Sequence, residues 1–219
     1  ISSMDLVNLP LIKRVAQTGK PMFMSTGMST MEQITEALET VWATGNNKLV
    51  LLQCVSSYPA SAEDMNLNVI STLASKFNTP VGFSDHSIGL LASTVSLSLG
   101  TAVIERHFTL DRFMEGPDHI LSSDVKELKE LVRIAHLVPR IKGSKEKRII
   151  GSETETASKF KKGLYAKVDI HGGTKITLDM LTIKGPGGAI LPRFQDEIIG
   201  KTVLTTIYAD FPILWGNIF

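Results

Sequence analysis

Four short runs of β-forming residues alternate with longer stretches of helical periodicity in the first part of the chain. The β-forming runs cover 21–25, 48–54, 80–84 and 102–108. They are almost continuously apolar, which is typical of parallel strands that helices cover from outside. A repeat of this kind, about thirty residues long, indicates the βα units of a parallel barrel.

The number of these repeats limits how much of a barrel the chain can form. A closed (β/α)8 TIM barrel needs about 250 residues, whereas four βα units are visible here. Four strands cannot close, so two hydrophobic strand edges would remain open to association. We therefore expect residues 1–139 to form the C-terminal half of a TIM barrel. Since the chain begins with "ISSMDLVNLP" rather than with Met, we interpret it as an incomplete fragment.

The composition changes after the fourth repeat. Residues 140–159 are charged, rich in Ser and Thr and poor in large apolar residues, as expected for an exposed linker. Residues 160–219 then show short alternating strands and a Gly172-Gly173 turn. We expect a small, separate β-rich domain there.

The charge balance and the cysteine count exclude several classes of protein. Lys and Arg number 23 against 22 Asp and Glu, and this balance gives no field that would hold nucleic acid or an anionic membrane. A single cysteine, Cys54, excludes an internal disulfide framework. No signal-peptide pattern opens the sequence, and no apolar run approaches the roughly 20 residues that cross a bilayer. We expect a cytoplasmic protein without nucleic-acid or membrane partners.

Polar residues stand at the end of every β-forming run. In a parallel barrel these ends converge on one face, where the loops build the site. Buried polar groups are costly unless partners or ligands satisfy them, so a shared ligand is the simplest explanation. The residues concerned are Ser25-Thr26-Gly27, Cys54-Val55-Ser56-Ser57-Tyr58, Ser84-Asp85-His86 and Glu105-Arg106-His107.

The two histidines of this set follow neighbouring strands. Imidazole nitrogens from His86 and His107 could meet at one ion and leave positions open for substrate oxygens, which suits a catalytic divalent metal. The alternative is that each histidine forms hydrogen bonds only within its own surroundings.

The remaining polar residues each allow two interpretations. Strand-end hydroxyls beside Gly27 could bind a phosphate or carboxylate, although Ser29 and Ser87 are explained equally well as helix caps. Glu105 could transfer a proton, or could form an ion pair with Arg106. Asp118, in the loop "GPDHILS", could bind sugar hydroxyls or cap a turn.

Several motifs together resemble the N-acetylneuraminate synthase family, which includes legionaminate, pseudaminate and spore-coat polysaccharide synthases. These motifs are "MSTGMST", "LLQCVSSYPA", "GFSDHSIG", "VIERHFTLDR" and "GPDHILS", and the resemblance runs from residue 1 to residue 219. It implies a TIM barrel followed by a small antifreeze-like (SAF) domain. It also implies condensation of phosphoenolpyruvate with an N-acetylated amino sugar, such as N-acetylmannosamine, to give a nonulosonic acid and phosphate.

The resemblance assigns a role to each matching residue. The metal, Mn²⁺ or Mg²⁺, would be held by His86 and His107. Phosphoenolpyruvate would be surrounded by Ser3, Ser25, Cys54, Ser56 and Ser84. The sugar would contact Tyr58 and Asp118, while Glu105 and Asp5 would be the catalytic carboxylates.

The chain also departs from the family pattern. A lysine before "ISS" and contacts from earlier strands are missing, so we expect no catalysis by this chain alone. The resemblance implies a domain-swapped homodimer in which an SAF-domain arginine reaches the sugar, but Gly185 stands at that position. Lys184 or Arg193 could replace it, or the sugar could be held differently. A non-catalytic relic that binds carbohydrate or a partner is the alternative function, and the second domain argues against an unrelated metal-dependent barrel enzyme.

Overall fold

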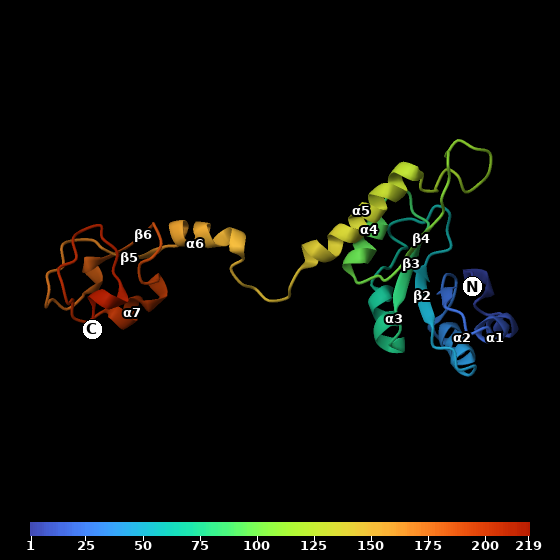
Figure 1. Ribbon diagram of the computed structural model, residues 1–219, viewed down its shortest axis with the longest axis horizontal. Helices are drawn as coiled ribbons and strands as arrows, with labels where there is room; N and C mark the ends of the chain where they lie inside the picture. Colours follow the sequence, from blue (N-terminus) through green and yellow to red (C-terminus); the bar gives the residue numbers. More distant parts are fainter. The chain divides into compact units, whose positions relative to one another are not determined.

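The computed structural model describes residues 1–219 as two units, Ile1–Gly143 and Ser144–Phe219, which are described separately here. The first unit contains a sheet of four parallel strands in chain order (Figure 1). They are β1 (Met22–Ser25), β2 (Leu49–Cys54), β3 (Val81–Asp85) and β4 (Ile104–Arg106). In the register of the last pair, Ser84 lies opposite Glu105 and Asp85 lies opposite Arg106.

Helices connect these strands and cover the sheet. They are α1 (Leu9–Ala16), α2 (Met31–Trp42), α3 (Val69–Phe77), α4 (Leu91–Ser98) and α5 (Val125–Lys142), preceded by a 3₁₀ helix at Ser3–Asp5. The sequence specifies several of their starts. Thr30 and Gln33 form a capping box at α2, and the Asp124 side chain accepts from the Glu127 amide at α5.

The core of the first unit lies between the strands and these helices. Leu51 and Phe83 from the sheet are fully buried with Leu38, Ile70 and Leu73 from the helices. Each such side chain contributes about 1.5–3 kcal/mol to stability through burial. The helices therefore fix the outer face of the sheet.

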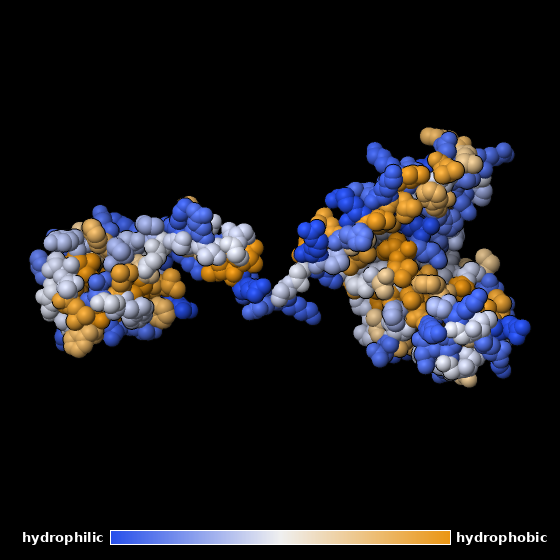
Figure 2. Space-filling view, viewed as in Figure 1, coloured by the Kyte–Doolittle hydropathy of each residue, from blue (hydrophilic) through white to orange (hydrophobic).

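The sheet is open at both edges, because β1 and β4 each pair with one neighbour. Phe23 on β1 is 45% exposed, and a cavity of about 370 Å³ lies between strand residues and Leu128 and Leu131 of α5. Hydrophobic residues are also visible on the surface along α5 in Figure 2. The open sheet of four parallel strands, covered by helices, confirms the predicted α/β half-barrel.

The second unit is small and irregular. Its strands β5 (Gly163–Ala166) and β6 (Leu181–Lys184) are antiparallel, and its helices are α6 (Thr154–Phe160) and α7 (Gln195–Ile198). Short 3₁₀ helices cover Gly151–Glu153, Leu178–Met180, Pro192–Phe194 and Trp215–Asn217. A separate core includes Leu164, Ile176 and Val203. The predicted β-rich character of residues 160–219 is therefore present.

Two elements differ in extent from their sequence patterns. The β-forming run 102–108 contains a strand over Ile104–Arg106, since Phe108 forms an isolated bridge with Ser123 instead. The exposed segment 140–159 holds the end of α5, a 3₁₀ helix and most of α6.

None of the helices combines the length and the apolar character that crossing a membrane would require.

Candidate functional site

One cavity of about 420 Å³ collects residues from the ends of all four strands. Its lining also includes the segment before α1, because Ser3 lies beside Ser25. The lining residues are Ser2, Ser3, Met4, Ser25, Met28, Ser56, Tyr58, Ser84, His86, Glu105 and His107. A larger cavity of about 470 Å³ between the loop after β2 and α4 has no titratable residue in its lining. The strand-end cavity is therefore the candidate site.

The rings of His86 and His107 lie next to each other at the ends of β3 and β4. Their centroids are 5.3 Å apart and their planes meet at 84°. His86 Nδ1 lies 2.8 Å from the Val55 carbonyl oxygen, to which it can donate, and His107 Nδ1 lies 3.6 Å from Asp118 Oδ2. Such partners on one ring nitrogen orient the other nitrogen toward a metal.

The donor set is therefore suited to a divalent ion held by two histidines. The local contacts of both histidines use Nδ1, so they are compatible with metal binding through Nε2, the second nitrogen of each ring. The first unit brings no third His, Cys, Asp or Glu into a metal-binding group with them. An ion here would keep coordination positions for oxygen ligands, as catalytic metals do.

Tyr58 covers both histidine rings. Its ring centroid lies 4.3 Å from that of His86 and 5.7 Å from that of His107. Partial burial, with the negative charges of Cys54, Asp118 and Glu105 nearby, raises the pKa of Tyr58 above its ordinary value. The phenol therefore stays protonated at neutral pH and can donate a hydrogen bond into the cavity.

A second part of the cavity is formed by hydroxyl groups. Ser3 Oγ lies 2.9 Å from Ser25 Oγ and accepts from the Gly27 amide at 3.1 Å. Ser56 Oγ is buried and has no hydrogen-bond partner. A buried hydroxyl without a protein partner in a polar cavity is available to bind a ligand or a water molecule.

Gly27 lies directly against the hydroxyls of Ser3 and Ser56. A Cβ atom at this position would lie 2.3 Å from Ser56 Oγ and 2.7 Å from Ser3 Oγ. Any other residue would therefore displace the Ser3 and Ser56 hydroxyls. The sequence pattern places Gly27 at the end of the first strand, beside the hydroxyls expected to bind an anion, and the structure shows its contacts with Ser3 and Ser56.

Cys54 does not line the cavity, but its thiol lies next to the serine hydroxyls that do. Its Sγ is 3.6 Å from Ser3 Oγ and 3.9 Å from His86 Nδ1. Burial alone would raise the pKa of Cys54, but hydrogen bonds with His86, Ser25 and Ser3 lower it to about 7. For His86, burial acts to lower the pKa, and the contacts with Cys54 and the Val55 carbonyl outweigh it and raise the pKa.

The two predicted aspartates lie outside the lining. Asp5 accepts from the Ser2 hydroxyl at 2.8 Å in the 3₁₀ helix before α1. Asp118, with a side chain 55% exposed, approaches His107 from the loop after β4. The structure therefore brings Asp118 to the histidine pair and places Asp5 at the edge of the site.

The alternative that Glu105 pairs with Arg106 is wrong. Ser84 Oγ donates to Glu105 Oε1 at 2.8 Å, whereas Arg106 Nη1 lies 2.5 Å from Asp85 Oδ2. Successive residues of a strand point to opposite faces, so Glu105 and Arg106 cannot both face the cavity. Glu105 is thereby left in the cavity lining.

Comparison with known proteins agrees with the resemblance seen in the motifs. Residues 1–147 match the NeuB family, and residues 161–218 match the SAF domain. The chain belongs to the NeuB family. Its second unit contains the SAF domain, so the predicted half-barrel followed by a small SAF domain is confirmed.

Relatives of this NeuB-family chain carry several synthase names. An uncharacterized protein of Methanocaldococcus jannaschii is 43% identical and covers all of the chain, which spans 65% of that relative. The N,N'-diacetyllegionaminic acid synthase of Legionella pneumophila is 35% identical over the whole chain, which spans 62% of it. The human N-acetylneuraminate-9-phosphate synthase is 38% identical over 98% of the chain, which spans 60% of it.

Solved structures show the same relationship. A spore coat polysaccharide biosynthesis protein of Bacillus subtilis is 32% identical with a TM-score of 0.63, covering 100% of this chain and 66% of its own. The N-acetylneuraminic acid synthetase of Leptospira borgpetersenii, in complex with citrate, is 35% identical with a TM-score of 0.66 over 71% of this chain and 54% of its own. The chain thus spans less than two thirds of the length of these relatives.

Proposed function

We propose that this chain carries the metal-binding and phosphoenolpyruvate-binding part of a nonulosonic acid synthase. The reaction joins phosphoenolpyruvate to an N-acetylated amino sugar, such as N-acetylmannosamine, and releases phosphate. The observation that carries the proposal is one cavity holding the adjacent rings of His86 and His107 beside the unpaired hydroxyl of Ser56. The synthase names of the relatives support the same reaction class.

His86 and His107 would hold the divalent ion, Mn²⁺ or Mg²⁺. When bound, such an ion supplies Lewis-acid polarisation of the sugar aldehyde. Val55 orients the His86 ring and Asp118 orients the His107 ring, so the two side chains lose less conformational freedom when the ion binds.

The serine hydroxyls of the cavity would bind the phosphate or the carboxylate of phosphoenolpyruvate. The hydroxyls of Ser3 and Ser56 lie against Gly27, Ser25 contacts Ser3, and the Cys54 thiol also contacts Ser3. No lysine or arginine lines this cavity. These residues therefore orient the anion without neutralising its charge, and we expect weak phosphoenolpyruvate binding by the chain alone.

The bond changes assign a role to Glu105. The C3 carbon of phosphoenolpyruvate attacks the aldehyde carbon, water adds at C2, and the C2–oxygen bond breaks as phosphate leaves. The added water loses two protons as C2 becomes a carbonyl: one leaves with phosphate and the other must reach the aldehyde oxygen. The second transfer needs a group that accepts and returns a proton. Glu105, oriented by Ser84, would do this, with Asp5 as a second acid at the cavity edge.

The sugar would be held by Tyr58 and Asp118. For the complete enzyme we propose a cytoplasmic, domain-swapped homodimer.

In the SAF domain, Lys184 forms an ion pair with Asp210, and Arg193 lies 4.5 Å over the Phe194 ring. Arg193 forms no ion pair with a carboxylate, unlike Lys184. Arg193 is therefore the better candidate to replace the arginine expected at Gly185. Domain limits of 1–139 and 160–219, with a linker over 140–159, belong to this proposal.

Calorimetric titration of the 219-residue chain with Mn²⁺, and then with phosphoenolpyruvate, tests the proposal. We expect Mn²⁺ binding that His86→Ala abolishes and that His136→Ala, an exposed histidine on α5, leaves unchanged. Equal Mn²⁺ affinity in His86→Ala and the wild type would contradict the assignment. Binding of N-acetyl sugars without Mn²⁺ or phosphoenolpyruvate would favour a carbohydrate-binding relic.

A further inference from the structure

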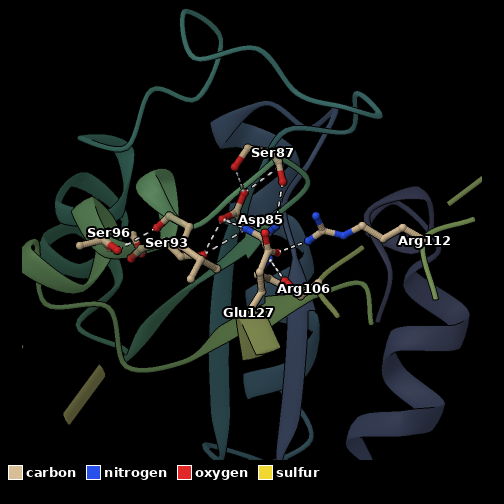
Figure 3. Close-up of polar contacts among 10 residues, drawn as sticks. Asp85, Ser87, Ser93, Ser96, Arg106, Arg112 and Glu127 are labelled. Atoms are coloured by element: carbon tan, nitrogen blue, oxygen red, sulfur yellow. Dashed lines mark hydrogen bonds and ion pairs between the residues drawn. The ribbon is translucent and has the colours of Figure 1, made fainter. Parts of the chain in front are cut away.

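A buried ion pair lies directly behind the candidate site. Asp85 Oδ2 and Arg106 Nη1 are 2.5 Å apart, and their side chains are 0% and 4% exposed. Figure 3 shows Asp85 among Ser87, Ser93 and Arg106. Such a pair is retained in a protein interior only where further hydrogen bonds satisfy both ions.

Each member of the pair stands between two residues of the cavity. Asp85 separates Ser84 from His86, and Arg106 separates Glu105 from His107. Because side chains alternate along a strand, the cavity residues face one side while the ion pair faces the helices. The pairing of Asp85 with Arg106 therefore sets the same register that brings Ser84 to Glu105.

The surrounding hydrogen bonds complete this arrangement. Asp85 Oδ1 accepts from the Ser87 amide at 2.8 Å and from its hydroxyl at 2.6 Å, and Oδ2 accepts from Ser93 Oγ of α4 at 2.5 Å. Arg106 donates from Nε to Ser123 Oγ at 2.9 Å and from Nη2 to the Ser87 carbonyl at 2.8 Å. The guanidinium group thus joins the residues that follow β3 to those that precede α5.

We propose that Asp85 and Arg106 are positioning residues that hold His86 and His107 at their metal-binding separation. The proposal rests on the proposed function, because it assigns the histidines to the metal. Arg106 uses three different nitrogens on three partners, and a lysine has one nitrogen on a flexible stem. Even the charge-conserving change Arg106→Lys should therefore loosen the histidine pair.

The first measurement is the Mn²⁺ affinity of the 219-residue chain. We expect Arg106→Lys and Ser123→Ala to fold and to bind Mn²⁺ about tenfold more weakly than the wild type, the lower end of the effect of losing a direct partner of a metal ligand, because Arg106 and Ser123 act on the histidines through the backbone. Leu38→Ala, a change in the α2 core, provides a control with reduced stability but unchanged affinity. If both site variants keep affinities within twofold of the wild type, the proposal is overturned.

The second measurement needs no metal. In the wild type, with ring centroids 5.3 Å apart, NMR should show cross-relaxation between the ring protons of His86 and His107. We expect this signal to disappear in Arg106→Lys and to persist in Leu38→Ala. Its persistence in Arg106→Lys would overturn the positioning role, whereas a wild type that fails to bind Mn²⁺ would contradict only the proposed function.

Discussion

Ser84 and Glu105 face each other across the β3–β4 pair, and the Ser84 hydroxyl donates a hydrogen bond of 2.8 Å to the Glu105 carboxylate. This contact joins the ends of two strands at the cavity. It also fixes the orientation of the carboxylate to which we assign proton transfer.

Removing that donor should lower stability measurably. Hydrogen bonds to charged groups are worth about 1.5–3 kcal/mol, and Ser84 is buried. We expect Ser84→Ala to lower the free energy of unfolding by about this amount in urea titrations. Ser98→Ala removes an exposed hydroxyl of α4 and should have almost no effect; equal losses in both variants would contradict the role of the contact.

A methyl group at position 27 should block the anion site. The Cβ of Gly27→Ala would lie 2.3 Å from Ser56 Oγ and 2.7 Å from Ser3 Oγ, so it would displace the hydroxyls that we expect to bind the anion. Calorimetry should show at least about a tenfold loss of phosphoenolpyruvate affinity, since one well-oriented charge-assisted hydrogen bond is worth about 1.4 kcal/mol or more. Gly151→Ala, with no atom within 4 Å of its Cβ, is the matched control. Unchanged binding in Gly27→Ala would place the anion elsewhere.

The thiol of Cys54 should titrate near neutral pH in the metal-free protein. Its pKa is lowered to about 7, so thiolate absorbance should rise with a midpoint there, and His86→Ala should move the midpoint upward. Because the folded pKa lies below the unfolded one, the stability that the thiolate contributes is fully present above the unfolded pKa. It is lost as the pH falls through about 7. A midpoint at the ordinary thiol pKa would contradict the contacts described for Cys54.

In the SAF domain, Gly163 should tolerate no side chain. A Cβ at this position would lie 2.5 Å from Ala189 Cβ, and overpacking of this kind costs about 1–3 kcal/mol. We expect Gly163→Ala to lower the stability of this unit in thermal unfolding, while Gly216→Ala, which meets no atom within 4 Å, changes nothing. Equal stability of the two variants would show that the strand can move away.

The sequence was most informative about where the strands end. The β-forming runs 21–25, 48–54, 80–84 and 102–108 identify neighbouring parallel strands, and the geometry of such a sheet brings their ends together. The four short runs therefore predicted which strand ends meet, but not which of their residues face the cavity, since Thr26, Asp85 and Arg106 do not line it.

Contacts between side chains were harder to predict. Nothing in "IERHF" says whether Glu105 or its neighbour faces the cavity, and the strand register decides that Arg106 pairs with Asp85. The composition of residues 140–159 indicated a linker, yet α6 begins within it at Thr154, with Lys159 and Glu155 one turn apart. Pairing and short helices depend on partners that a pattern does not reveal.

The central claim is that one ion is held by two imidazoles from neighbouring strands. Pulsed EPR of the Mn²⁺-loaded chain measures it directly, because each ligating histidine contributes a nitrogen coupling to the metal. We predict couplings from two histidine nitrogens in the wild type and from one in either His86→Ala or His107→Ala. Mn²⁺ bound without any nitrogen coupling, or a coupling that neither substitution changes, would contradict it.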